Sequence, residues 1–120
     1  MRIIADAKIP HAVAEFTQFG DVLVLPTKAI KREAIRDADA ILIRSETKVT
    51  ASLLEGTRVR FVGTATIGTD HVDLEYLQRH NIAFASCPGS NANSVAEYVL
   101  AALLELGAMF DVSLRGKTLG

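Results

Sequence analysis

The sequence predicts an open α/β fold in which a sheet of parallel strands is flanked by helices. Two observations support this prediction. Short apolar runs recur along the chain, and they are near-continuous rather than alternating, which is typical of strands covered on both faces. Segments with helical spacing lie between these runs. Strands that alternate with helices favour a parallel sheet with right-handed crossovers.

The apolar runs give five candidate strands. In chain order they are IIA from Ile3, VLVL from Val22, AILI from Ala40, FV from Phe61 and IAFA from Ile82.

The first helix signals lie between these strands. Apolar residues step at helical spacing over 9–19, where Pro10 suits a first turn and Gly20 suits a stop. Thr50 is placed to cap a short helix that ends at Gly56. Both segments are therefore expected to cross over between strands.

Two further helices follow. Asp73 is a suitable cap for LEYLQRHN, and Asn81 tolerates the left-handed conformation of a helix exit. The segment 92–106 is more apolar than a surface helix, and Ser94 with Glu97 matches a capping box at its start. Because its polar stripe is narrow, this helix is expected to pack against another domain or another subunit.

Composition excludes several classes of protein. The chain has 120 residues, a length that suits one domain. It has 13 basic and 14 acidic residues, so it lacks the excess of positive charge that is typical of a nucleic-acid-binding protein. The single cysteine, Cys87, excludes an intrachain disulfide and disfavours a cysteine zinc site. Neither a signal peptide nor a membrane span is expected, so the protein is predicted to be cytoplasmic.

Three loops follow predicted strands and are candidate binding loops, because ligands of open α/β sheets bind beyond the carboxyl ends of the strands. They are 44–48 (RSETK), 63–73 and 86–94 (SCPGSNANS). The guanidinium of Arg44, with nearby hydroxyls and a lysine, suits a carboxylate or phosphate. The alternative is a solvated turn in which Arg44 pairs with Glu46.

The loop 63–73 does not match a nucleotide-triphosphate site. Gly63 and Gly68 have the spacing of a phosphate loop, but Thr69 and Asp70 stand where that motif requires lysine and then serine or threonine. His71 has no evident orienting carboxylate and is interpreted as structural.

The remaining candidates for chemistry are weaker. His11 and His80 are interpreted as surface residues, and Cys87 as an inert small residue. A phosphorylation-receiver domain has this length and fold class, but it needs an acidic pair after the first strand, where Asp6 stands alone. That interpretation is therefore rejected.

Four stretches together resemble the N-terminal part of the D-isomer-specific 2-hydroxyacid dehydrogenases. They are MRIIADAKIP, ILIRSETKV, FVGTATIGTDHVD and PGSNANSVAEYV, and the likeness covers essentially all 120 residues. The third and fourth stretches narrow it to members that act on 4-phospho-D-erythronate. The resemblance implies a flavodoxin-like substrate-binding domain, followed by an NAD-binding Rossmann domain in a homodimeric enzyme.

The implied reaction oxidises the 2-hydroxyl of 4-phospho-D-erythronate to give 2-oxo-3-hydroxy-4-phosphobutanoate, on the path to pyridoxal 5′-phosphate. The resemblance places substrate contacts at Ser45 in RSETK and at Thr66, the second threonine of GTAT. Arg44 is a further candidate for an anionic group, and Asn91 matches an asparagine that touches substrate in some relatives.

The resemblance also implies what these residues lack. The arginine, the glutamate-supported histidine and the GxGxxG loop of the family lie downstream, so no catalytic, cofactor-binding or metal-binding residue is expected here. The expected division is a substrate-binding domain over 1–120 with a linking helix at about 92–107, and over 115–120 the start of an otherwise absent nucleotide-binding domain. The chain alone is expected to be inactive.

Two alternatives stay open. The chain is either part of such an enzyme or a non-enzymatic binding or regulatory remnant that kept the same fold. A different D-2-hydroxyacid dehydrogenase, such as a phosphoglycerate dehydrogenase, is the second alternative for the parent enzyme.

Overall fold

The computed structural model describes residues 1–118 and divides the chain into two compact units, Met1–Pro88 and Gly89–Gly120. The first unit contains a sheet with its helices, and the second contains one long helix and the turn that follows it. The predicted beginning of a further domain over 115–120 includes residues 119–120, which lie outside the described residues. No helix of the described residues is long and apolar enough to cross a membrane.

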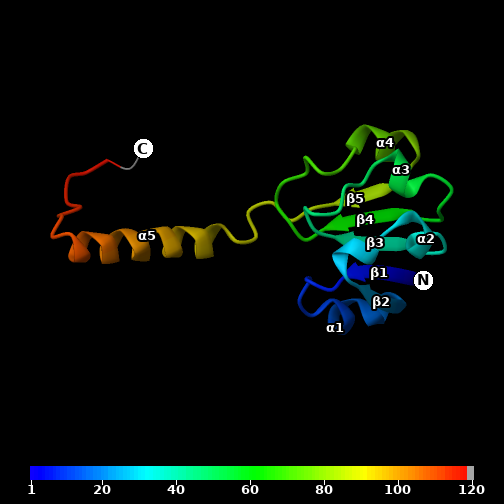
Figure 1. Cartoon of the computed structure of the whole chain (residues 1–120), viewed down its shortest axis with the longest axis horizontal. Helices are drawn as coiled ribbons and strands as arrows, with labels where there is room; N and C mark the ends of the chain where they lie inside the picture. The colour runs from blue at the N-terminus through cyan, green and yellow to red at the C-terminus, as the bar shows by residue number, and fades with distance from the viewer. Residues whose placement is uncertain (119–120) are drawn as a thin grey trace. The chain divides into compact units, whose positions relative to one another are not determined.

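A five-stranded parallel sheet forms the centre of the first unit (Figure 1). Its strands are β1 (Arg2–Asp6), β2 (Asp21–Leu25), β3 (Ala40–Ile43), β4 (Phe61–Thr64) and β5 (Ala83–Ala85). Their spatial order is β2-β1-β3-β4-β5, which is the flavodoxin-like order. The predicted fold class and all five predicted strands are therefore confirmed.

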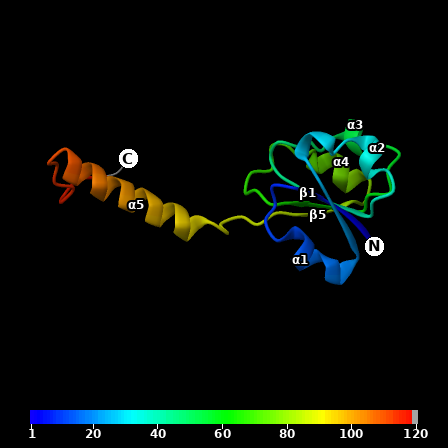
Figure 2. The ribbon, with the colours of Figure 1, turned by 60° about the horizontal axis from the view of Figure 1, so that its bottom comes forward.

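Helices cover the two faces of the sheet unequally. Three of them, α2 (Arg32–Ile35), α3 (Ala51–Leu54) and α4 (Leu74–Arg79), contribute to the larger core cluster with Ile4 and Ile41. Figure 2 shows α1 (Ala12–Phe16) on the other face, where the 3-10 helix η1 (Thr17–Phe19) follows it. A smaller core cluster that includes Ile3 and Ala12 lies on this face.

The strands differ in burial according to their place in the sheet. Every residue of the central β3 is buried, and β1 is buried from Ile3 onward. The edge strands β2 and β5 have no buried residue. The expectation that near-continuous apolar runs mark strands covered on both faces therefore holds at the centre of the sheet and not at its edges, where one neighbouring strand is missing.

The helix expected over 9–19 begins later than predicted. His11 has a left-handed backbone with φ of 59°, so α1 begins at Ala12 and Pro10 lies outside it. After Phe16 the chain tightens into η1, which ends at Gly20 as predicted. Two short helices were not predicted, α2 and the 3-10 helix η2 (Thr27–Ala29), because they are too short to show an apolar period.

The caps of α3 and α4 differ in chemistry. Asp73 Oδ1 accepts a hydrogen bond from Tyr76 N over 2.9 Å, so the predicted cap of α4 is confirmed. Thr50 occupies the N-cap position of α3, but its hydroxyl bonds to Ser52 Oγ over 2.8 Å instead of to a backbone N–H. The predicted left-handed exit at Asn81 is confirmed by a φ of 55°.

Asp39 joins the strands at the amino edge of the sheet. Its Oδ2 accepts from Arg2 N over 2.7 Å, and Arg58 Nη2 lies 3.2 Å from its Oδ1. The hydrogen bond from the Arg2 backbone is the largest effect on the Asp39 carboxyl and lowers its pKa below the ordinary value of 3.8. Burial raises the pKa by less, and the positive charges of Arg58 and the N-terminus lower it further. Asp39 is thus held in its charged form.

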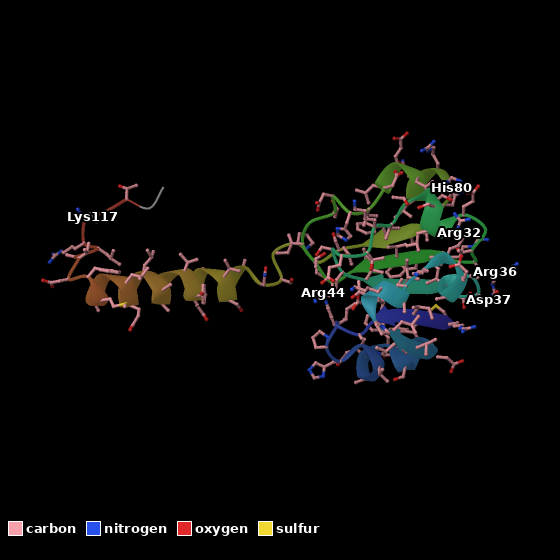
Figure 3. All side chains as sticks on the ribbon, viewed as in Figure 1. Arg32, Arg36, Asp37, Arg44, His80 and Lys117 are labelled. Atoms are coloured by element: carbon pink, nitrogen blue, oxygen red, sulfur yellow. The ribbon has the colours of Figure 1, made fainter. Side chains whose placement is uncertain are left out.

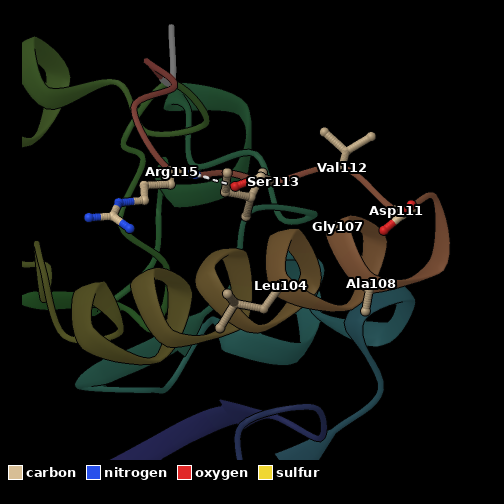
Figure 4. A pocket seen from close by; sticks show the side chains of 8 residues that line it. Leu104, Gly107, Ala108, Asp111, Val112, Ser113 and Arg115 are labelled. Carbon is tan, nitrogen blue, oxygen red and sulfur yellow. Dashed lines mark hydrogen bonds between the residues drawn. The ribbon is translucent and has the colours of Figure 1, made fainter.

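The second unit is built on α5 (Ala92–Met109), which has no buried residue. The capping box expected from Ser94 and Glu97 is wrong, because the helix already begins at Ala92 and Asn91 is its N-cap residue. After α5 the chain turns back, with Val112 N donating to Gly107 O over 2.8 Å. This turn and the last helical turns line a hollow of about 430 Å³, where Arg115 N donates to Ser113 Oγ over 3.3 Å (Figure 4).

Candidate substrate-binding site

The two loops that carry the main candidate residues leave neighbouring strands at one edge of the sheet. β3 and β4 end with Ile43 opposite Thr64, and just beyond them Ala65 N donates to Ile43 O over 2.9 Å. Ser45 and Thr66 each stand two residues past those paired ends. Because neighbouring strands lie about 4.8 Å apart, the two residues begin adjacent loops at the carboxyl edge, where open α/β sheets bind ligands.

A backbone bridge ties the far ends of these loops together. Val49 and Val72 form an isolated parallel bridge. Val49 N donates to His71 O, and Asp73 N donates to Val49 O, both over 2.8 Å. Residues 44–48 are therefore held by β3 at one end and by the bridge at the other, and 65–71 are held in the same way by β4 and the bridge.

An ion pair joins the loops that follow β1 and β3, the two strands at which the strand order reverses. Lys8 Nζ lies 2.6 Å from Glu46 Oε1 and 2.9 Å from Oε2, with both side chains 52% exposed. An exposed pair of this kind contributes about 0–1 kcal/mol. The alternative interpretation of 44–48, a turn with an Arg44–Glu46 ion pair, is wrong about the partner, because Glu46 pairs with Lys8.

Arg44 lies at the edge where the strands end, opposite the edge that carries Arg36 and Asp37 (Figure 3). It is half-buried, and within residues 1–118 no carboxylate lies within ion-pair distance of its guanidinium. A guanidinium is a fork of N–H donors that accepts no hydrogen bond, so this position suits an anionic ligand.

Thr66 is connected to the interior by a short chain of polar side chains. Its Oγ1 lies 2.9 Å from Thr64 Oγ1, which in turn lies 3.1 Å from His71 Nε2. Thr64 and His71 are buried and Thr66 is half-buried, whereas His11 and His80 are exposed as expected. The sequence showed no link between Thr64 and His71, because the contact arises only when the loop returns over the end of β4 to reach the bridge.

A second hollow lies on the less covered face of the sheet and has a volume of about 330 Å³. Cys87, which is exposed, is one of the residues that line it. The residues that line it are otherwise apolar, apart from one threonine: Ile9, Phe16, Leu42, Phe61, Gly63, Thr64, Ala65 and Ala85. None of these residues carries a charged side chain, so this hollow has no cationic group for an anion.

Asn91 belongs to the second unit. It is exposed, and its side chain makes no capping hydrogen bond to α5. Of the four candidate residues, Arg44, Ser45 and Thr66 thus gather at one edge of the first unit. The substrate contact predicted for Asn91 stays a prediction.

Comparison with known families gives one extended match. A family model described as "D-isomer specific 2-hydroxyacid dehydrogenase, catalytic domain" matches residues 3–115. Similar curated proteins include the erythronate-4-phosphate dehydrogenases of Azotobacter vinelandii, 53% identical, and Pseudomonas syringae pv. syringae, 52% identical, each aligned over all 120 residues. The chain spans 32% of the length of either relative.

Solved structures agree on the fold. An NAD⁺-bound 3-phosphoglycerate dehydrogenase from Entamoeba histolytica is 26% identical with a TM-score of 0.69, covering 84% of this chain and 37% of that one. The TT0316 protein of Thermus thermophilus is 21% identical with a TM-score of 0.75, covering all of this chain and 43% of that one. At that identity the second likeness shows the fold alone.

Proposed function

This chain belongs to the D-isomer specific 2-hydroxyacid dehydrogenase family, and from that premise we propose that it is the substrate-binding part of an NAD-dependent enzyme that oxidises 4-phospho-D-erythronate. The oxidation converts the 2-hydroxyl of the substrate to a ketone, in a path that leads to pyridoxal 5′-phosphate. The substrate assignment is supported by the names of the relatives that are 52–53% identical.

The observation that carries the proposal is the arrangement of Ser45, Thr66 and Arg44 on two loops tied by the Val49–Val72 bridge. Hydroxyl groups and a guanidinium donate hydrogen bonds, and the carboxylate and phosphate of the substrate only accept them. Loops fixed at both ends hold these donors in place before the ligand arrives, which reduces the entropy lost on binding.

The cofactor belongs to another part of the proposed enzyme. NAD supplies the hydride acceptor for such an oxidation. These 120 residues contain no GxGxxG sequence, and no side chain among them is assigned to NAD. We therefore propose that the 120-residue chain alone has no dehydrogenase activity, and turnover of NAD with 4-phospho-D-erythronate by the purified chain would refute this.

Binding is tested by titrating 4-phospho-D-erythronate into the ¹⁵N-labelled chain. The amide signals of 44–48 and 65–71 should shift, and Thr66→Val should weaken binding roughly ten- to hundredfold, as expected for a hydrogen bond to a charged group. Thr69→Val is the matched control, because Thr69 lies in the same loop and its hydroxyl makes no hydrogen bond within residues 1–118. Equal effects of the two variants would refute the site.

The alternative parent enzyme gives a different result in the same titration. 3-Phosphoglycerate binding more tightly than 4-phospho-D-erythronate would favour a phosphoglycerate dehydrogenase as the parent. Binding alone does not distinguish the non-enzymatic module, so an activity assay is needed: oxidation of 4-phospho-D-erythronate by a protein that contains these residues together with an NAD-binding domain would exclude that alternative.

We also propose that the enzyme is a cytoplasmic homodimer and that α5 takes part in a subunit or domain contact. The contact of α5 is supported by its large apolar side chains that are exposed, among them Val95, Val99, Leu100, Leu104 and Leu106. Light scattering should detect self-association of the chain, and Leu100→Glu should reduce it while Ser94→Glu on the same helix should not. A monodisperse monomer at high concentration would refute the subunit contact.

A further inference from the structure

The polar chain behind Thr66 has a direction that can be derived by counting protons. A threonine hydroxyl donates one hydrogen bond and accepts two. Thr64 Oγ1 has three neighbours: Thr66 N at 3.4 Å, Thr66 Oγ1 at 2.9 Å and His71 Nε2 at 3.1 Å. The backbone N–H of Thr66 only donates. The one proton of Thr64 therefore goes either to His71 or to the hydroxyl of Thr66, and the other group must donate to Thr64.

The tautomer of His71 decides between these two arrangements. If Nε2 is bare, the hydrogen bonds run inward, from Thr66 to Thr64 to His71, and the proton of Thr66 is used inside the protein. If Nε2 carries a proton, they run outward, from His71 to Thr64 to Thr66, and the proton of Thr66 remains available to a ligand.

The surroundings of His71 Nδ1 favour the outward direction. Nδ1 is buried and has no hydrogen-bond partner among the described residues. The nearest carboxylate oxygen, Asp70 Oδ1, is 3.9 Å away on a side chain that is 95% exposed, which is too far for a hydrogen bond. Among buried backbone groups, an N–H without a partner is rarer than a carbonyl that lacks part of its hydrogen bonding, and we apply the same preference to the ring nitrogen of His71. The proton is thus better placed on Nε2, where Thr64 accepts it.

We propose that His71 is a positioning residue that carries its proton on Nε2 and, through Thr64, fixes the hydroxyl of Thr66 as a donor to an anionic oxygen of the substrate. This inference rests on the proposed function. Carboxylate and phosphate oxygens only accept hydrogen bonds, so the outward direction presents a proton to them. The inward direction would set the lone pairs of Thr66 against those of the ligand.

The first test measures the tautomer directly and needs no ligand. Long-range ¹H–¹⁵N spectra of the ¹⁵N-histidine-labelled chain distinguish a protonated ring nitrogen from a bare one. The signals of His71 are identified from His11→Gln and His80→Gln, because those two histidines are exposed. A proton on Nε2 supports the inference, and a proton on Nδ1 alone overturns it.

The second test asks whether the direction matters for binding. Thr64→Val keeps the shape of the side chain but breaks the relay, and we expect 4-phospho-D-erythronate to bind roughly three- to tenfold more weakly. Thr64→Ser restores the hydroxyl and should stay within about twofold of the parent. His71→Gln keeps an N–H donor near the position of Nε2 and should lose less affinity than His71→Leu. A purely structural role for these residues would not give this rescue pattern.

Two controls are needed, one for variants that do not fold and one for the anionic group that Thr66 contacts. Amide spectra and thermal midpoints identify variants that do not fold, and for those the tautomer measurement still decides the inference. Titrations with D-erythronate and with inorganic phosphate distinguish the two anionic groups: a Thr64→Val effect on one of them identifies the group that Thr66 contacts.

Failure of this inference differs from failure of the proposed function. If Thr66→Val weakens binding but Thr64→Val does not, the relay from His71 is refuted and the site remains. If Thr66→Val has no effect on any of the three ligands, the proposed site is refuted, and the role of His71 with it.

Discussion

The unequal cover of the two sheet faces predicts different costs for one substitution at adjacent positions. Ile3 and Ile4 follow each other in β1, point to opposite faces and are 1% and 0% exposed. Replacing either with alanine removes the same apolar groups, a loss of roughly 2.4 kcal/mol in transfer free energy at about 0.8 kcal/mol for each carbon. The two variants therefore differ only in the space that the removed atoms leave behind.

That space is different on the two faces. Ile4 lies in the larger cluster, beneath α2, α3 and α4, where a new cavity is closed on all sides. Ile3 lines an existing hollow of about 370 Å³ on the other face, so its loss enlarges a space that is already open. Since isoleucine to alanine costs about 2–5 kcal/mol in protein cores, we expect Ile4→Ala near the upper end and Ile3→Ala near the lower end.

The measurement is urea unfolding of both variants and the parent, followed by far-UV circular dichroism because the chain has no tryptophan. Hydrogen exchange of the β1 and β3 amides confirms that the transition reports on the first unit and not on α5. Ile4→Val and Ile3→Val are the matched controls and should cost about 0.5–1.5 kcal/mol each. If Ile3→Ala lowers the free energy of unfolding as much as Ile4→Ala, the reasoning from unequal cover is refuted.

Three further predictions concern a cap, a carboxylate and a turn. Asp73→Ala removes the cap of α4 and should lower the unfolding free energy by about 1 kcal/mol in urea, while Asp73→Ser should recover most of it. Because the pKa of Asp39 is lowered, its charged form stabilises the fold above its ordinary value of 3.8, and this stability is lost as the pH falls through the lowered pKa. Asp39→Asn should therefore unfold at lower urea than the parent at neutral pH, with a gap that closes in acid; a constant gap would contradict this origin. Gly56→Ala should cost about 1–2 kcal/mol, because Gly56 has a φ of 74° with open space around it, so only the left-handed backbone resists a side chain.

The sequence predicted the elements whose signals are local. Each strand was visible as an apolar run, and Asp73 could be predicted as a cap because its acceptor lies three residues from the N–H that it binds. Predictions failed where a competing local contact was stronger, as at Thr50, whose hydroxyl bonds to Ser52. The left-handed backbone at His11, which delays α1, has little sequence signal, because only a minority of histidines adopt it.

The candidate site was predictable only in part, for a physical reason. Ser45 and Thr66 came from a resemblance, and the parallel pairing of β3 with β4 accounts for their adjacent loops. The contact of Lys8 with Glu46 joins residues 38 positions apart, and it depends on β1 and β3 being neighbours. Strand order is a tertiary property, so contacts between the loops after β1 and β3 cannot be predicted from any one segment of the sequence.

The bridge between Val49 and Val72 has a consequence for how such a site changes in evolution or in design. Its hydrogen bonds are made by backbone atoms, and they place no demand on the side chains of the loops between them. Substitutions at the exposed and half-buried positions of 44–48 and 65–70 therefore change the groups presented to a ligand and leave the backbone bridge in place. A library confined to the exposed and half-buried positions of those loops should keep a high proportion of folded members while it explores other hydroxy acids.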